Sequence, residues 1–183
     1  MTPTQAREDD DSKAAPKGGD ERRFRELLAA DIDIRIARDG TWYHEGGAIR
    51  RPALVKLFAG ILKREGDEYF LITPVEKRRI RVEDAPFIAV AVTAEAGKLT
   101  FRTNVDDSVT AGPQHPIRVA FDDETGEPSP YVMVREGLEA LIARPVYYEL
   151  VGLGELAERD GRQALIVASG GAEFILGYAD DDG

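Results

Sequence analysis

The sequence predicts an α+β fold built from two related subdomains in tandem. Short segments in which apolar and polar residues alternate recur along most of the 183 residues, one amphipathic helix interrupts them, and a similar order of segments occurs twice. The composition, 43% hydrophobic and 32% charged, is typical of a globular protein that buries a core. The polar residues 1–21 and the acidic residues 180–183 have little to bury, so we expect both segments to be disordered tails.

The N-terminal subdomain is expected over residues 22–86. Ile32, Ile34 and Ile36 alternate with polar residues, which predicts a strand, and the turn at 38–40 continues into a hairpin. Residues 51–65 predict a helix because apolar residues recur at helical spacing after a proline near its start. These apolar residues are Leu54, Leu57, Phe58, Ile61 and Leu62. Strands are expected over 68–73 and 75–84.

The C-terminal subdomain is expected over residues 87–179, with the boundary near Pro86, and its pattern is mainly that of strands. Strands are predicted over 87–94, 98–103, 117–121 and 131–134, a short helix over 135–143, and further strands over 146–151, 163–168 and 173–177.

An internal repeat relates the two subdomains. Three pairs of segments are similar: Ile34–Thr41 with Ile117–Gly126, Ala53–Phe58 with Gly137–Ile142, and Tyr69–Phe70 with Tyr147–Tyr148. Their order and spacing agree, which predicts a duplication in which each half has a hairpin, a helix and further strands. The alternative is that any two units of this kind look alike at this level.

Several functional classes lack their signatures. The chain has no cysteine and two histidines, so a thiolate metal site, a cysteine nucleophile and a usual zinc tetrad are not expected. Neither a GxSxG nucleophile motif nor a GxxxxGK phosphate loop occurs, and no run of about 18 apolar residues predicts a membrane span. We therefore expect no metal, no cofactor and, from the absence of cysteine, a cytoplasmic location.

The net charge of −10 argues against nucleic acid as a partner. The charge is unevenly distributed, because residues 22–82 hold 14 basic and 9 acidic residues whereas residues 83–179 hold 7 and 16. The two halves are therefore expected to attract one another.

The charged stretch "TPVEKRRIRVEDAPF", residues 73–87, lies where these halves meet. In an extended chain Lys77 and Arg79 share one side while Glu76, Ile80 and Asp84 share the other, so the stretch is not a uniform basic face. We expect it to line an interdomain cleft that binds a ligand. The candidate residues are Trp42, Tyr43, His44, Glu76, Lys77, Arg79, Glu83 and Asp84. The alternative is a charged strand whose ion pairs only hold the two halves together.

This stretch and "DGTWYHEGGAIRRPALVKLF", residues 39–58, closely resemble the bacterial family known as domain of unknown function 1285, and the likeness extends over about residues 22–179. The resemblance implies a duplicated core of two α+β domains, of which the second is superficially similar to pleckstrin-homology folds. It also implies a role in signal transduction with a ligand site at the domain interface, and it implies no established activity.

Three functions remain open from the sequence. The first is a non-catalytic cytoplasmic module that binds an unknown small ligand or protein partner between its domains. The second is a hydrolase that uses His44 with Glu76, Glu83 or Asp84 as acid and base. The third is a nucleic-acid-binding protein acting through Arg78, Arg79 and Arg81, which the overall charge disfavours.

Overall fold

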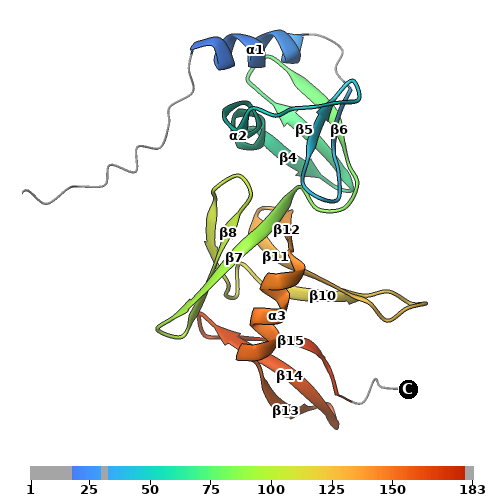
Figure 1. Ribbon diagram of the computed structural model, residues 1–183, viewed down its shortest axis with the longest axis vertical. Coiled ribbons are helices and arrows are strands. Elements are labelled where there is room, and N and C mark those ends of the chain that lie inside the picture. Colours follow the sequence, from blue (N-terminus) through green and yellow to red (C-terminus); the bar gives the residue numbers. More distant parts are fainter. Residues whose placement is uncertain (1–17, 30–32, 180–183) are drawn as a thin grey trace, which may run out of the picture.

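The computed structural model describes residues 18–29 and 33–179, which form an α+β structure with three helices and three sheets (Figure 1). Two of these sheets have six strands each and follow one another along the chain, so the predicted fold class of two related α+β units in tandem is confirmed. Helix α1 (Gly18–Ala29) overlaps the last four residues of the predicted tail 1–21. The predicted tail segments 1–17 and 180–183 lie outside the described residues.

The N-terminal domain consists of α1, a first six-stranded sheet and helix α2. After α1 its elements are β1 (Ile34–Ile36), β2 (Trp42–His44), β3 (Gly47–Ala48), α2 (Pro52–Gly60), β4 (Leu62–Glu65), β5 (Glu68–Ile72) and β6 (Lys77–Val82). The strand order is β3-β2-β1-β6-β5-β4, and the central pair, β1 with β6, is the parallel one. Each half of the sheet is therefore an antiparallel meander, and α2 connects the two halves.

The two faces of this first sheet differ because side chains alternate along each strand. Ile36 and Trp42 lie on the face that packs against α2, with exposed fractions of 0% and 1%. The predicted apolar stripe of α2 buries Leu54 and Phe58 on the same side. The helix ends at Gly60, earlier than predicted, because Leu62 continues into β4 and is buried there.

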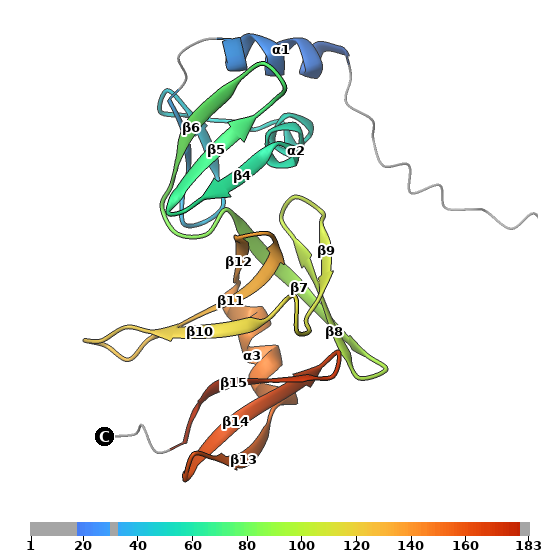
Figure 2. The same ribbon diagram turned by 180° about the vertical axis from the view of Figure 1, so that it is seen from behind.

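The C-terminal domain contains a second six-stranded sheet, helix α3 and a three-stranded sheet. The second sheet consists of β7 (Phe87–Glu95), β8 (Lys98–Thr103), β9 (Ser108–Thr110), β10 (Ile117–Phe121), β11 (Pro128–Arg135) and β12 (Leu138–Ile142). Helix α3 (Arg144–Leu153) is followed by β13 (Glu155–Arg159), β14 (Arg162–Ser169) and β15 (Ala172–Tyr178). Helix α3 contacts both β7 and β14 and so lies between the two sheets (Figure 2).

The two six-stranded sheets have the same topology. The second has the order β9-β8-β7-β12-β11-β10, again with a central parallel pair, β7 with β12. The residue just after β6 and the residue just after β12 make equivalent hydrogen bonds across the parallel pairs. The backbone N–H of Glu83 donates to the carbonyl of Ile36, and that of Ala143 donates to the carbonyl of Ala89. The duplication therefore relates β1–β6 to β7–β12.

The segment pairs that led to the duplication are nevertheless wrong in detail. Ile34–Thr41 contains β1, whose topological equivalent is β7, whereas Ile117–Gly126 contains β10. The second pair matches α2 with β12, and the third matches β5 with α3. The similarity of these segments reflects their composition, while the true repeat resides in strand order.

Two predicted elements of the C-terminal domain are exchanged in type. Residues 135–143, predicted as a helix, contain β12, because Leu138 and Ala140 are buried in a strand held between β11 and β7. Residues 146–151, predicted as a strand, belong to α3, where Val146 and Leu150 are buried one turn apart. Pro145 near the start of α3 is compatible with a helix because its missing N–H has no partner there.

Buried apolar side chains of both domains form one continuous core. Polar contacts also join the domains: Lys56 and Asp106 form an ion pair at 2.5 Å, Arg64 donates to the carbonyl oxygen of Gly137 at 3.2 Å, and Arg135 donates to that of Ala59. Between the halves as divided after residue 82, the described residues form three ion pairs of opposite charges: Arg35 with Glu83, Arg38 with Asp84 and Lys56 with Asp106.

Candidate functional site

The eight residues predicted to bind a ligand do not meet in one place. Three lie on β2, three lie on or just before β6 along an exposed part of the first sheet, and two lie after β6 where the domains meet. These three groups are Trp42, Tyr43 and His44; Glu76, Lys77 and Arg79; and Glu83 and Asp84.

The residues of β2 point to opposite faces of the first sheet. Trp42 is a core residue whose ring stacks on Phe58, with a distance of 5.9 Å between ring centroids. Tyr43 lies on the other face under the guanidinium group of Arg35, 4.3 Å from the ring centroid. His44 is paired with Ile34 on the core side and lines a hollow beside α1.

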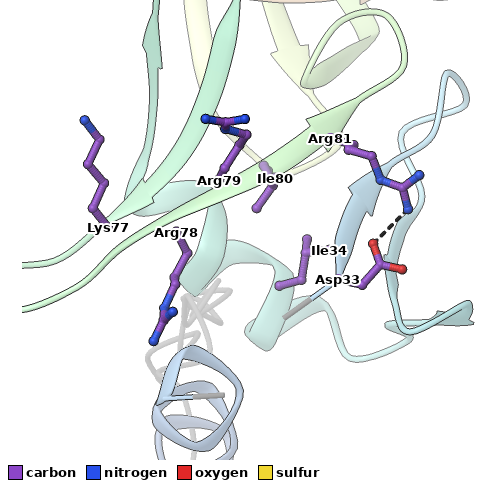
Figure 3. Close-up of a pocket in the computed structure, with 7 residues that line it drawn as sticks. All are labelled: Asp33, Ile34, Lys77, Arg78, Arg79, Ile80 and Arg81. Atoms are coloured by element: carbon purple, nitrogen blue, oxygen red, sulfur yellow. Dashed lines mark hydrogen bonds and ion pairs between the residues drawn. The ribbon is translucent and has the colours of Figure 1, made fainter. Parts of the chain in front are cut away.

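The basic residues of β6 are already paired with carboxylates. Figure 3 shows Lys77 and Arg79 extending to one side of the strand and Arg78 to the other. Lys77 lies 2.6 Å from Glu65, and Arg79 lies 3.2 Å from Glu68. These residues border an open hollow of about 550 Å³, but their charges are largely balanced there. Glu76 pairs with Arg78 at 3.1 Å.

Glu83 and Asp84 lie at the domain interface, and both interact with Arg38. The backbone N–H of Arg38 donates to Glu83 at 3.0 Å, and the Nε atom of Arg38 lies 3.6 Å from Asp84. The far end of the Arg38 side chain reaches into the C-terminal domain and donates to the Oγ atom of Ser129 at 3.2 Å. The two predicted carboxylates therefore position an arginine that spans both domains.

Arg38 lines a pocket of about 360 Å³ between the domains, which we call the interdomain pocket. The remaining lining comes from the start of β11, the end of β12 and the first turn of α3. Its polar and aromatic groups include Ser129, Arg144, Tyr147 and Tyr148. Arg144 pairs with Glu127 at 2.6 Å, and Tyr148 is 62% exposed.

Hydrogen bonds at the interface perturb two titratable groups. The backbone N–H of Arg38, followed by the side chain of Arg35, lowers the pKa of Glu83 below its usual value and keeps this carboxylate charged. Burial, followed by the hydrogen bond to Asp84 at 2.6 Å, raises the pKa of Tyr131 to about 12. Both effects favour the protonation states that hold the interface together.

The sequence patterns missed the residues that line this pocket. Arg38 occupies a hairpin turn, where a charged side chain is ordinarily solvated, and Tyr148 lies in a segment predicted as a strand. One sequence feature could have drawn attention to Arg38 as a site residue: it directly precedes residues 39–58, which carry the family resemblance.

The alternative sites are not assembled. His44 pairs with Ile34 at the start of β1, whereas Glu83 and Asp84 follow the other end of the parallel pair, about 10 Å away by strand rise. Ile34 is level with Ile80 of β6, and Glu76 lies four residues before Ile80, about 13 Å along the strand direction. His44 therefore has none of the predicted carboxylates as a close partner.

The three arginines of the nucleic-acid hypothesis do not form one surface. Arg78 points to the opposite face of the sheet from Arg79 and Arg81. Arg81 pairs with Asp33 at 2.7 Å, as Arg79 does with Glu68. These arginines do not present a continuous basic footprint to a phosphate backbone.

Across residues 18–29 and 33–179, no group of three or more histidine, aspartate or glutamate side chains is arranged to hold a metal ion. No helix in this part of the chain has the length and apolar character needed to cross a membrane.

Comparisons with known proteins agree with the two-domain architecture. Two family models match in succession, and both describe DUF1285, a protein domain of unknown function. The model of its N-terminal domain matches residues 26–85, and the model of its C-terminal domain matches residues 86–176. A comparison with curated proteins gave no match.

Two solved structures are similar to this chain. A DUF1285 family protein from Silicibacter pomeroyi DSS-3 is 54% identical over 82% of each chain, with a TM-score of 0.75. A DUF1285 family protein from Shewanella baltica OS155 is 32% identical over 66% of this chain and 91% of that chain, with a TM-score of 0.54. With both domain models matched in order along the chain, this protein belongs to the DUF1285 family.

Proposed function

We propose that this protein is a non-catalytic binding module whose ligand occupies the interdomain pocket. The observation that carries this proposal is the position of Arg38, a residue of the N-terminal domain that lines a pocket otherwise built by the C-terminal domain. A ligand there contacts both domains at once. The pocket volume of about 360 Å³ lies within the range of small-molecule sites, which runs from about 300 to 1,000 Å³.

The lining residues favour a ligand that has an acidic group and an apolar part. Arg38 and Arg144 supply guanidinium groups, which pair with Asp84 and Glu127 and have further N–H donors for carboxylate or phosphate oxygens. Tyr148 presents an exposed ring, and Leu141 and Pro130 add apolar surface. A small aromatic or branched carboxylic acid, or an acidic segment of a partner protein, matches this combination.

The same arrangement supports a role in signal transduction. Binding energy that depends on groups from two domains stabilises one relative placement of those domains, which a partner protein can recognise. We place the module in the cytoplasm because the chain has no cysteine. The domain division at residues 22–86 and 87–179 and the likeness of the second domain to pleckstrin-homology folds are further parts of this proposal.

A thermal-shift screen against small carboxylic acids and phosphate esters tests this function. A ligand at about 100 times its dissociation constant stabilises the folded state by about 2.7 kcal/mol, which is readily measured. We expect a saturable ligand whose affinity falls in Arg38→Gln and in Arg144→Gln. Arg79→Gln is the matched control, because it removes an exposed arginine that lies on β6 outside the pocket.

The outcomes separate the competing interpretations. Loss of affinity in Arg79→Gln with unchanged affinity in Arg38→Gln would move the site to the charged strand β6. Turnover of a substrate in a hydrolase assay, abolished by His44→Ala, would overturn the non-catalytic proposal.

A further inference from the structure

A second hollow, of about 540 Å³, lies in the N-terminal domain between α1, the β2–β3 hairpin and the start of α2. It shares no lining residue with the interdomain pocket. Its polar side chains are predominantly basic: Arg22, Arg23, Arg50, Arg51 and His44, with Glu26 as the carboxylate of the lining. We call it the basic hollow.

The positive charge of the basic hollow is only partly balanced. Glu26 is shared between Arg22 and Arg23 at the long distances of 3.7 and 3.8 Å. Arg51 pairs with the buried Asp20 at 2.8 Å, which fixes its guanidinium group at the rim. Four arginines face two carboxylates, so the hollow keeps an excess of positive charge in a chain whose net charge is −10.

Arg50 lines the basic hollow and also a neighbouring hollow of about 230 Å³ beside Trp42 and Lys56. It is exposed, and within the part of the chain that the structure describes it makes no ion pair. The cations of β6 show the contrasting arrangement, because Lys77, Arg79 and Arg81 each have a carboxylate within 3.2 Å. An arginine left unpaired beside three others is available to an external anion.

The start of α2 reinforces this electrostatic field. Arg51 occupies the N-cap position, and its side chain makes no capping hydrogen bond. The N-terminus of a helix carries a partial positive charge, which adds to that of the surrounding arginines. His44 lines the same hollow from the β2 side.

We propose that the basic hollow binds a phosphate group of a phosphorylated ligand. The arginines lie on two sides of the hollow, so a ligand that contacts both sides must accept hydrogen bonds from more than one guanidinium group. Phosphate can do so because its several oxygens have a tetrahedral arrangement. The ligand is a soluble polyphosphate compound or the head group of an anionic phospholipid, since both present this chemistry.

Isothermal titration of the full chain with pyrophosphate tests the proposal. We expect saturable binding that weakens at least about threefold in Arg50→Gln and in Arg23→Gln, as loss of one charge-assisted contact predicts. Lys63→Gln is the matched control, because this substitution removes the same charge from an exposed residue on β4 that does not line the hollow. Trp42 fluorescence verifies that each variant is folded.

A second arm distinguishes the two sources of phosphate. Co-sedimentation with phosphatidylglycerol vesicles that depends on Arg50 supports a lipid head group, and Arg50-dependent pyrophosphate binding without vesicle binding supports a soluble ligand. The proposal fails if pyrophosphate does not bind, if Lys63→Gln weakens binding as much as Arg50→Gln, or if only Arg38→Gln weakens it. Binding of duplex RNA without binding of pyrophosphate also overturns it.

Discussion

At the scale of single residues, the hydrogen bond from Tyr131 to Asp84 joins the two domains at a partly buried polar contact. The Tyr131 hydroxyl lies 2.6 Å from Asp84, and the tyrosine is 7% exposed. Burial and the neighbouring carboxylate both oppose the phenolate form, so the pKa of Tyr131 rises from 10.0 to about 12 on folding. Because the folded pKa is the higher one, the associated stability is complete below pH 10 and is lost as pH rises through 12.

Replacing Tyr131 by phenylalanine tests this contact. We expect Tyr131→Phe to lower the free energy of unfolding by about 1–3 kcal/mol at pH 7, because Asp84 loses its partner. In an absorbance titration at 295 nm, the component missing from the variant is expected to titrate near pH 12. A missing component centred near pH 10 would show that Tyr131 does not experience this environment.

Residue-scale prediction from sequence was informative only about general position. Glu83 and Asp84 were expected at the junction between the two oppositely charged halves, and both lie beside Arg38 after β6, while their part in binding a ligand stays a prediction. Arg38 was not expected, because its role depends on Ser129 in the other domain, 91 residues along the chain. A turn residue carries no local sign of such a partner.

At the scale of elements, the side chains of β6 alternate between the core and the solvent, so neighbouring residues contribute differently to stability. Ile80 is 4% exposed and packs in the core, whereas Arg79 next to it is solvent-exposed and pairs with Glu68. We expect Ile80→Ala to cost about 2–5 kcal/mol and Arg79→Ala about 0–1 kcal/mol. Urea denaturation in low salt and in 1 M NaCl measures both, and only the Arg79 difference should shrink in salt. A cost above 2 kcal/mol for Arg79→Ala would contradict the structural assignment.

The element types of the C-terminal domain were only partly predictable. The helix α2 was predictable because its apolar stripe and Pro52 act locally. The segment Leu138–Ile142 is rich in residues that favour helices. Its pairing with β7 on one side and β11 on the other nevertheless imposes a strand. Val146, Tyr147 and Tyr148 favour strands, yet Val146 and Leu150 bury one face of α3. In both cases a tertiary partner overrides local preference.

At the scale of the whole molecule, the hairpin turn of the first domain packs directly on the second. Gly40 has a φ of +87°, and a Cβ atom there would lie 2.7 Å from Ile88 and 2.8 Å from Asn104. Gly46 has a similar φ of +81° but no atom within 4 Å of its Cβ position. The two glycines thus share the backbone requirement, and only Gly40 has the interdomain contact.

Alanine at these two glycines separates backbone strain from interdomain packing. Gly46→Ala should cost about 1–2 kcal/mol, because alanine disfavours the left-handed conformation. Gly40→Ala should cost at least about 1 kcal/mol more, because its methyl group displaces Ile88 or Asn104.

The single tryptophan, Trp42, reports unfolding of the N-terminal domain by fluorescence, while far-UV circular dichroism reports both domains. In the native chain the two unfolding curves should coincide, because one core spans both domains. In Gly40→Ala they should separate, whereas in Gly46→Ala they should shift together; equal behaviour of the two variants would mean that the turn at Gly40 does not couple the domains.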